Sequence, residues 1–162
     1  MMRKTVVGAV APAKASIDGT WLKIEDMAAV EVTSEENTFP IEHALGAEAT
    51  TGWRASATGP QVVRLRFDTP QAIRRIHVHF VERAGERSQE FAIYADTGTD
   101  GSLREVVRQQ WSFSPGGATE EIEDYRVDLH NVSTLELRID PDRSHDPAKS
   151  QSYASLQQMR LA

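Results

Sequence analysis

Apolar and polar residues alternate with a period of two along most of this chain. Between positions 61 and 68, Val63, Leu65 and Phe67 alternate with polar or charged residues. Successive side chains of a β-strand point to opposite faces, so this pattern predicts a strand with one buried and one solvated face. Later segments repeat the alternation, with apolar positions at Ile76, Val78 and Phe80, at Phe91, Ile93 and Ala95, at Tyr125, Val127 and Leu129, and at Leu135, Leu137 and Ile139.

Turn-forming residues divide these segments. Asp68-Thr69-Pro70 is predicted to turn the chain after the first strand, and His130-Asn131 is predicted to join the last two. Glycine, proline and aspartate indicate further loops at 83–86, 96–101 and 114–117, with another strand over 104–113. About eight strands separated by such turns predict an antiparallel β-sandwich or jelly roll.

The two ends of the chain complete this outline. A first strand is predicted at 5–10, and short helical turns are predicted within 21–29 and 40–45. The closing apolar set of Leu156, Met159 and Leu161 changes parity midway, which a β-bulge explains. We therefore expect one domain over residues 1–162, in which 1–29 form the N-terminal strand and a lead-in segment.

Charge and cysteine content narrow the possible partners. The 162 residues include no cysteine, which excludes disulfides, thiolate metal sites and cysteine nucleophiles. A net charge of −6 opposes binding to nucleic acid and to acidic membrane surfaces. The apolar stretch near the start is short and is interrupted by Gly8, which disfavours a cleaved signal peptide. We expect a cytoplasmic protein.

Segment 43–53, HALGAEATTGW, resembles the signature turn of discoidin or coagulation-factor type C domains, which have a galactose-binding-domain-like fold. In that family an Asn-Ala-Ile-Asp-Gly-Asp run precedes a Thr and a Trp at this spacing. Further similarity lies in 61–67, 87–94 and 153–161. The resemblance implies a β-sandwich that binds a ligand, similar to bacterial carbohydrate-binding modules.

The family's calcium ligands are replaced in this chain. Many members hold a structural calcium ion through the Asp-Gly-Asp turn and a Glu in the closing strand. The matching positions here are Gly46, Ala47 and Glu48, together with Gln157 or Gln158. Calcium requires several hard, negatively charged oxygens, so we predict no metal site and no cofactor.

The resemblance also implies a sugar site among loops at one end of the sandwich. An acidic residue, Glu35 or Glu36, a polar neighbour of the signature Trp, and an arginine after the loop would hold the ligand. The candidate binding residues are Glu36, Arg54, Arg83, Arg87 and Trp111. Arg87 has the same odd-numbered parity as the apolar positions of its strand, which turns it inward, so it either forms a salt bridge that locks the loop or contacts the ligand. Trp111 fits either the core or the rim.

Other chemistry-bearing groups have simpler interpretations. His77 and His79 share a strand face that, with Glu82, is similar to a cupin metal motif, but the spacing fails and that face is the polar one. Trp53 is predicted to be core, and the acidic run 120–124 is predicted to be solvated. Arg143 and His145 lie in a polar loop that is a reserve site.

No catalytic residue is predicted, because no nucleophile motif or phosphate-binding loop occurs in the sequence. We therefore expect a non-enzymatic binding module whose partner is a carbohydrate. A protein-interaction module on the same fold is the main alternative, and a metal-dependent jelly-roll enzyme is a third.

Overall fold

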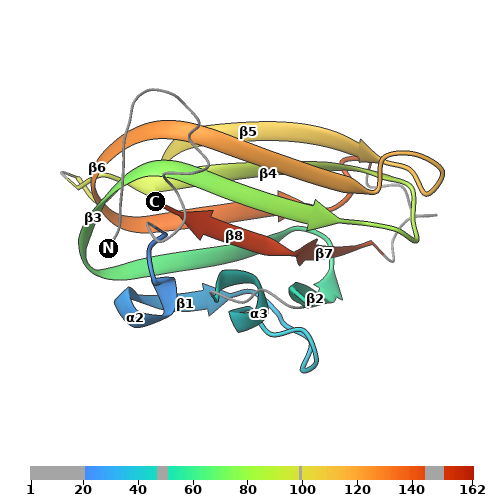
Figure 1. Cartoon of the computed structure of the whole chain (residues 1–162), viewed down its shortest axis with the longest axis horizontal. Coiled ribbons are helices and arrows are strands. Elements are labelled where there is room, and N and C mark those ends of the chain that lie inside the picture. Colours follow the sequence, from blue (N-terminus) through green and yellow to red (C-terminus); the bar gives the residue numbers. More distant parts are fainter. Residues whose placement is uncertain (1–20, 47–50, 99, 145–151) are drawn as a thin grey trace.

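The computed structural model describes residues 21–46, 51–98, 100–144 and 152–162. The predicted strand at 5–10 and the question of a signal peptide lie outside these residues. Figure 1 shows a β-sandwich with two short helical turns along one side. The elements are α2 (Ile24–Met27), β1 (Ala28–Val32), α3 (Glu42–Leu45), β2 (Trp53–Thr58), β3 (Gln61–Val81), β4 (Arg87–Asp96), β5 (Arg104–Phe113), β6 (Glu120–Asp140), β7 (Tyr153–Leu156) and β8 (Gln158–Leu161).

All strand pairs in the described residues are antiparallel, as the turn-rich sequence predicts. The larger sheet has the order β1-β3-β6-β4-β5, and β8 pairs with the second half of β3. A separate two-stranded sheet consists of β2 and β7. The first half of β3 pairs with β1 and its second half pairs with β8, so this strand runs through both layers of the sandwich (Figure 1).

Two predicted turns are instead bends within continuous strands. Asp68-Thr69-Pro70 lies inside β3, where the pairing with β6 shifts register between Arg66 and Gln71. The missing N–H of Pro70 is tolerated there because the hydrogen-bonded ladder is interrupted. Asn131, with φ of 55°, lies inside β6 at the matching bend. Register shifts of this kind bend strands, and they allow one strand pair to serve both layers.

The core fills the space between the layers with the apolar positions that the alternation predicts. Val63, Leu65 and Phe67 are buried, and so are Phe91 and its neighbours at 93 and 95. Trp53 is 1% exposed, and its Nε1 donates to the carbonyl oxygen of Ser34 at 3.1 Å. The prediction of a core tryptophan is therefore confirmed.

The parity change near the C-terminus has a different origin from the predicted bulge. β7 pairs with β2, whereas β8 pairs with β3, so the chain changes sheets at Gln157. The backbone N–H of Gln157 donates to the carbonyl oxygen of His79 at 2.8 Å. Leu156 in β7 and Met159 and Leu161 in β8 are all buried, because each strand turns these side chains inward in its own sheet.

β1 was not predicted, since its five residues are too short to show a clear pattern.

Candidate functional site

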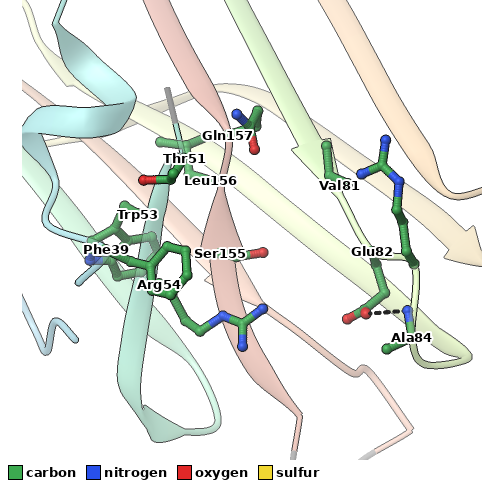
Figure 2. A pocket seen from close by; sticks show the side chains of 11 residues that line it. Phe39, Thr51, Trp53, Arg54, Val81, Glu82, Ala84, Ser155, Leu156 and Gln157 are labelled. Carbon is green, nitrogen blue, oxygen red and sulfur yellow. Dashed lines mark hydrogen bonds between the residues drawn. The ribbon is translucent and has the colours of Figure 1, made fainter. Parts of the chain in front are cut away.

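A cleft with two adjoining lobes lies at one end of the sandwich. The lobes have volumes of about 250 and 410 Å³ and share Arg54, Glu82, Ala84 and Ser155. One wall is the β2–β7 ribbon, and the other is the loop between β3 and β4, residues 82–86. In Figure 1 these elements lie at the same end of the molecule, and Figure 2 shows their side chains from close by.

The β2 wall presents Arg54 because its neighbour Trp53 points into the core. Successive strand residues face opposite sides, so an inward Trp53 turns Arg54 outward. Phe39 supports it: the guanidinium carbon lies 5.4 Å from the centre of the Phe39 ring. The backbone of Arg54 also bonds to this segment, its N–H donating to Phe39 O at 3.1 Å and its carbonyl accepting from Glu36 N at 2.9 Å. Figure 2 shows Arg54 beside Phe39, with its guanidinium extended toward the wall that carries Glu82.

The opposite wall is fixed by Glu82. Its Oε1 accepts a hydrogen bond from Nε of Arg87 at 2.8 Å, and its Oε2 accepts from the backbone N–H groups of Ala84 at 3.1 Å and Gly85 at 3.2 Å. Partial burial acts to raise the pKa of Glu82, but Arg87 and the two amides outweigh it and hold that pKa below the usual value. The carboxylate is therefore charged, occupied and able to hold the loop in one conformation. Arg83, between these residues, is exposed and lines the smaller lobe.

Arg87 points inward, as its parity predicts, and forms the salt bridge that the sequence left as one of two alternatives. The residue is 3% exposed, and Nη1 donates to Gln89 Oε1 at 3.0 Å and to the carbonyl oxygen of Pro141 at 2.8 Å. Its guanidinium also lies over the ring of Phe113, 4.8 Å from the ring centre. Arg87 thus braces the cleft from behind, and its fork is not open to a ligand.

A buried polar chain continues from Arg87 into the sandwich. Nε2 of Gln89 donates to Oε1 of Glu121 at 3.3 Å, and both residues are buried. Burial, together with the nearby carboxylate of Glu123, raises the pKa of Glu121 to about 8. The prediction that the whole 120–124 run is solvated is therefore wrong at Glu121, because alternation along β6 turns this position inward.

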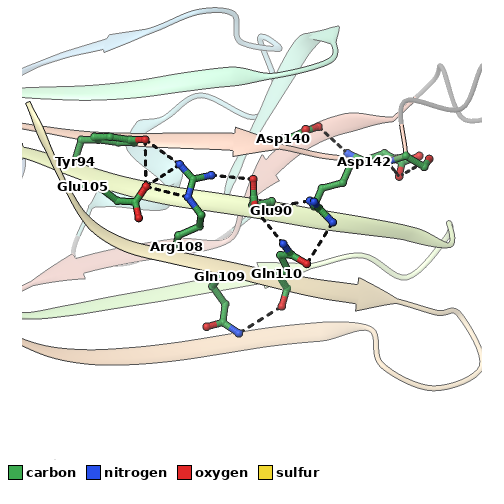
Figure 3. A network of polar contacts seen from close by, with 10 residues as sticks. Glu90, Tyr94, Glu105, Arg108, Gln109, Gln110, Asp140 and Asp142 are labelled. Atoms are coloured by element: carbon green, nitrogen blue, oxygen red, sulfur yellow. Dashed lines mark hydrogen bonds and ion pairs between the residues drawn. The ribbon is translucent and has the colours of Figure 1, made fainter.

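The other predicted binding residues do not line the cleft. Glu36 contacts the cleft residues Arg54 and Phe39 through its backbone, its N–H donating to Arg54 O at 2.9 Å and its carbonyl oxygen accepting from Phe39 N at 3.0 Å. Trp111 lies opposite Gln89 in the β4–β5 register and packs, partly buried, against the core. Arg143 contacts Gln110 and Glu90, at the edge of the polar network that Figure 3 shows on β4 and β5. His145 lies outside the described residues.

His77 and His79 lie on the strand face opposite the core, as predicted. His77 Nδ1 is 3.6 Å from Asp124, and His79 Nε2 is 2.8 Å from Glu120. Within the described ranges, no group of three or more His, Asp or Glu side chains is placed to hold a metal ion. The same residues include no helix long and apolar enough to cross a bilayer.

Sequence reasoning missed Phe39 and Ser155 as cleft residues and considered Glu82 only as a metal ligand. Phe39 carries no motif, and its role depends on the turn that brings it against Arg54. Ser155 reaches the cleft because β7 pairs with β2, in which Arg54 is opposite Ser155. No local pattern could reveal a pairing between segments about a hundred residues apart.

Comparison with known proteins identifies the fold. A scan against protein-family models finds no match, and neither does a search of curated proteins. Solved structures of carbohydrate-binding modules match over most of the chain. The family 32 module of AlyQ, in complex with 4,5-unsaturated mannuronic acid, has a TM-score of 0.58 and 16% identity, covering 85% of this chain and 95% of that one.

Two further modules are similar to a comparable degree. The family 32 module of NanJ from Clostridium perfringens, in complex with galactose, has a TM-score of 0.58 and 16% identity, covering 87% of this chain and 96% of that one. A chitosan-binding module of a chitosanase/glucanase from a Paenibacillus species has a TM-score of 0.55 and 18% identity, covering 83% and 94%. The chain therefore has the galactose-binding-domain-like sandwich fold that the signature turn suggested.

Proposed function

We propose that this chain, which has the sandwich fold of carbohydrate-binding modules, is a non-catalytic module that binds a saccharide in the cleft between the β2–β7 ribbon and the 82–86 loop. The observation that carries the proposal is the exposed guanidinium of Arg54, held by Phe39 at the mouth of a preformed hollow. Arginine donates several hydrogen bonds in a fixed plane, which suits adjacent sugar hydroxyls. The hydroxyl of Ser155 and the exposed Arg83 line the same hollow.

The chemistry of the cleft supports binding over catalysis. Hydrolysis of a glycosidic bond requires two available carboxyl groups at a set separation. The described lining contains Glu82 and Glu86, and both oxygens of Glu82 are bound by Arg87 and the loop amides. Glu82 is therefore a structural carboxylate, and the described lining retains only Glu86 as an available acid.

The surface gives less support to a protein-interaction module. A docking surface for a protein is expected to expose a contiguous apolar patch. Among the described residues, Ile122 is the one large hydrophobic side chain that is exposed, at 58%. An isolated apolar side chain of this kind is ordinary on any soluble protein.

A glycan array followed by calorimetry on the bound glycan tests the proposal. Arg54→Ala removes the guanidinium at the mouth of the cleft and should weaken binding by about ten-fold or more, the equivalent of one or two charged hydrogen bonds. Arg104→Ala, an exposed arginine on β5 that does not line the cleft, is the matched control and should bind as wild type does. Equal affinities for Arg54→Ala and wild type would place the sugar elsewhere, and an empty array would contradict the proposal.

A further inference from the structure

The described lining of the cleft has more positive than negative side chains, whereas the protein as a whole is negatively charged. Its described lining holds three arginines and two glutamates, whereas the whole chain has a net charge of −6. Arg87 and Glu82, which are among these five residues, neutralise each other through their ion pair. The exposed charges that remain are the guanidinium groups of Arg54 and Arg83 and the carboxylate of Glu86.

Unlike most arginines in the described part of the chain, Arg54 and Arg83 have no acidic partner there. Across the residues that the structure describes, neither guanidinium lies within 4.0 Å of a carboxylate, while Arg64 and Arg108, for example, each contact two. The two side chains come from opposite walls, Arg54 from β2 and Arg83 from the loop after β3, and both line the smaller lobe. Two unpaired cations in one concave site attract an anion more strongly than either would alone.

Both guanidinium groups have supports that leave their donors free. Phe39 supports the Arg54 guanidinium, whose carbon lies 5.4 Å from the ring centre. Glu82 fixes the loop that carries Arg83 through bonds to Arg87, Ala84 and Gly85. Because these supports are present before a ligand binds, ordering the site costs little on binding.

We propose that the ligand is an acidic saccharide whose uronic acid carboxylate is bound by Arg54 and Arg83. This inference rests on the proposed function, since it names the class of sugar that the same cleft selects. A planar carboxylate accepts two parallel hydrogen bonds from a guanidinium, a geometry that a neutral hydroxyl does not match. Modules of this fold are seen with 4,5-unsaturated mannuronic acid and with galactose, and a third is named as chitosan-binding, so the selection lies in the cleft residues of this chain.

The test compares each acidic oligosaccharide with its own methyl ester. Oligomers of galacturonate, glucuronate, mannuronate and guluronate serve as probes, and esterification removes the negative charge while it preserves the sugar ring and linkage. Calorimetry should show at least one acid bound about ten-fold more tightly than its ester. Added salt should weaken the binding of the acid and leave the binding of the ester nearly unchanged.

Two variants connect this preference to the two arginines. Arg83→Gln should bring the affinity for the acid close to that for the ester. It should not unfold the protein, because Arg83 is exposed. Arg54→Gln should weaken both, the acid more. Arg104→Gln, at an exposed position on β5 outside the cleft, should change neither the affinity for the acid nor that for the ester.

The outcomes separate this inference from the proposal on which it rests. Equal affinity for acid and ester, or binding of neutral glycans alone, would overturn the acidic-sugar inference and leave the binding module intact. Binding of sulfated glycans without uronates would also overturn it. Failure to bind any saccharide on the array would instead remove the proposed function.

Discussion

Removal of Arg87 should destabilise the fold because its guanidinium is a buried brace. In Arg87→Met the side chain keeps much of its volume but loses the bonds to Glu82, Gln89 and Pro141 O. Breaking a buried, hydrogen-bonded ion pair by deleting one partner costs about 3–5 kcal/mol. For a chain of this size, about 2–4 °C of melting temperature corresponds to each kcal/mol, so the melting temperature should fall by about 6–20 °C.

A matched variant separates burial from charge. Arg108→Met likewise deletes an arginine that forms ion pairs, in this case with Glu90 and Glu105. The Arg108 side chain, however, is 43% exposed within the network of Figure 3. Exposed ion pairs contribute at most about 1 kcal/mol, so this variant should melt close to wild type. Arg87→Lys should fall between the two, since it keeps a charge and loses the planar fork. Differential scanning calorimetry measures all three, and an Arg87→Met variant that melts as high as Arg108→Met would refute the role of Arg87 as a brace.

Three further predictions concern titration, backbone and metal. The pKa of Glu121 is raised from 4.5 to about 8, so its contribution to the free energy of unfolding is complete below about pH 4.5 and is lost as the pH rises through 8. In urea unfolding, wild type should therefore lose stability relative to Glu121→Gln over that pH range. Parallel curves of stability against pH would contradict this. Gly52 and Gly59 both have positive φ, but Gly52→Ala should destabilise the protein more than Gly59→Ala. A Cβ at Gly52 would lie 2.7 Å from the carbonyl oxygen of Leu156 in β7, whereas a Cβ at Gly59 would meet nothing within 4 Å. Gly59→Ala should cost about 1–2 kcal/mol by chemical denaturation, and equal losses would show that the close approach is absent. Melting curves with calcium and with chelator should coincide, because Gly46 stands where the discoidin domains that the sequence resembles have a calcium-binding carboxylate; a marked rise of the melting temperature with calcium would disprove this.

The arrangement of inward and outward residues was predictable because it is a local property. Side chains of a strand alternate whatever the strand pairs with, so Val63, Leu65 and Phe67 could be assigned to the core from their spacing. The same alternation placed Arg87 on the inner face and His77 on the outer one. The signature turn also indicated the fold, through its resemblance to discoidin domains.

The continuity of the long strands was decided by tertiary structure. Pro70 and Asn131 each suggest a turn when they are viewed locally, since one lacks an N–H and the other favours a left-handed backbone. Each lies instead at a bend, because pairing between β3 and β6 continues on both sides of it. The free energy of that pairing depends on a partner about sixty residues away, which no local pattern contains.

Which side chains meet at the cleft was likewise decided by the fold. Arg54 and Arg83 could be named as candidates from their positions, but their shared lobe depends on the approach of the β2–β7 ribbon to the 82–86 loop. The charge of the lobe depends on which arginines already have carboxylate partners, so it follows from distances between distant segments. The sequence by itself thus determined which face of each strand a residue occupies, and only the tertiary structure decided which arginines are left unpaired at the cleft, because ion pairing is set by separation in space and not by spacing along the chain.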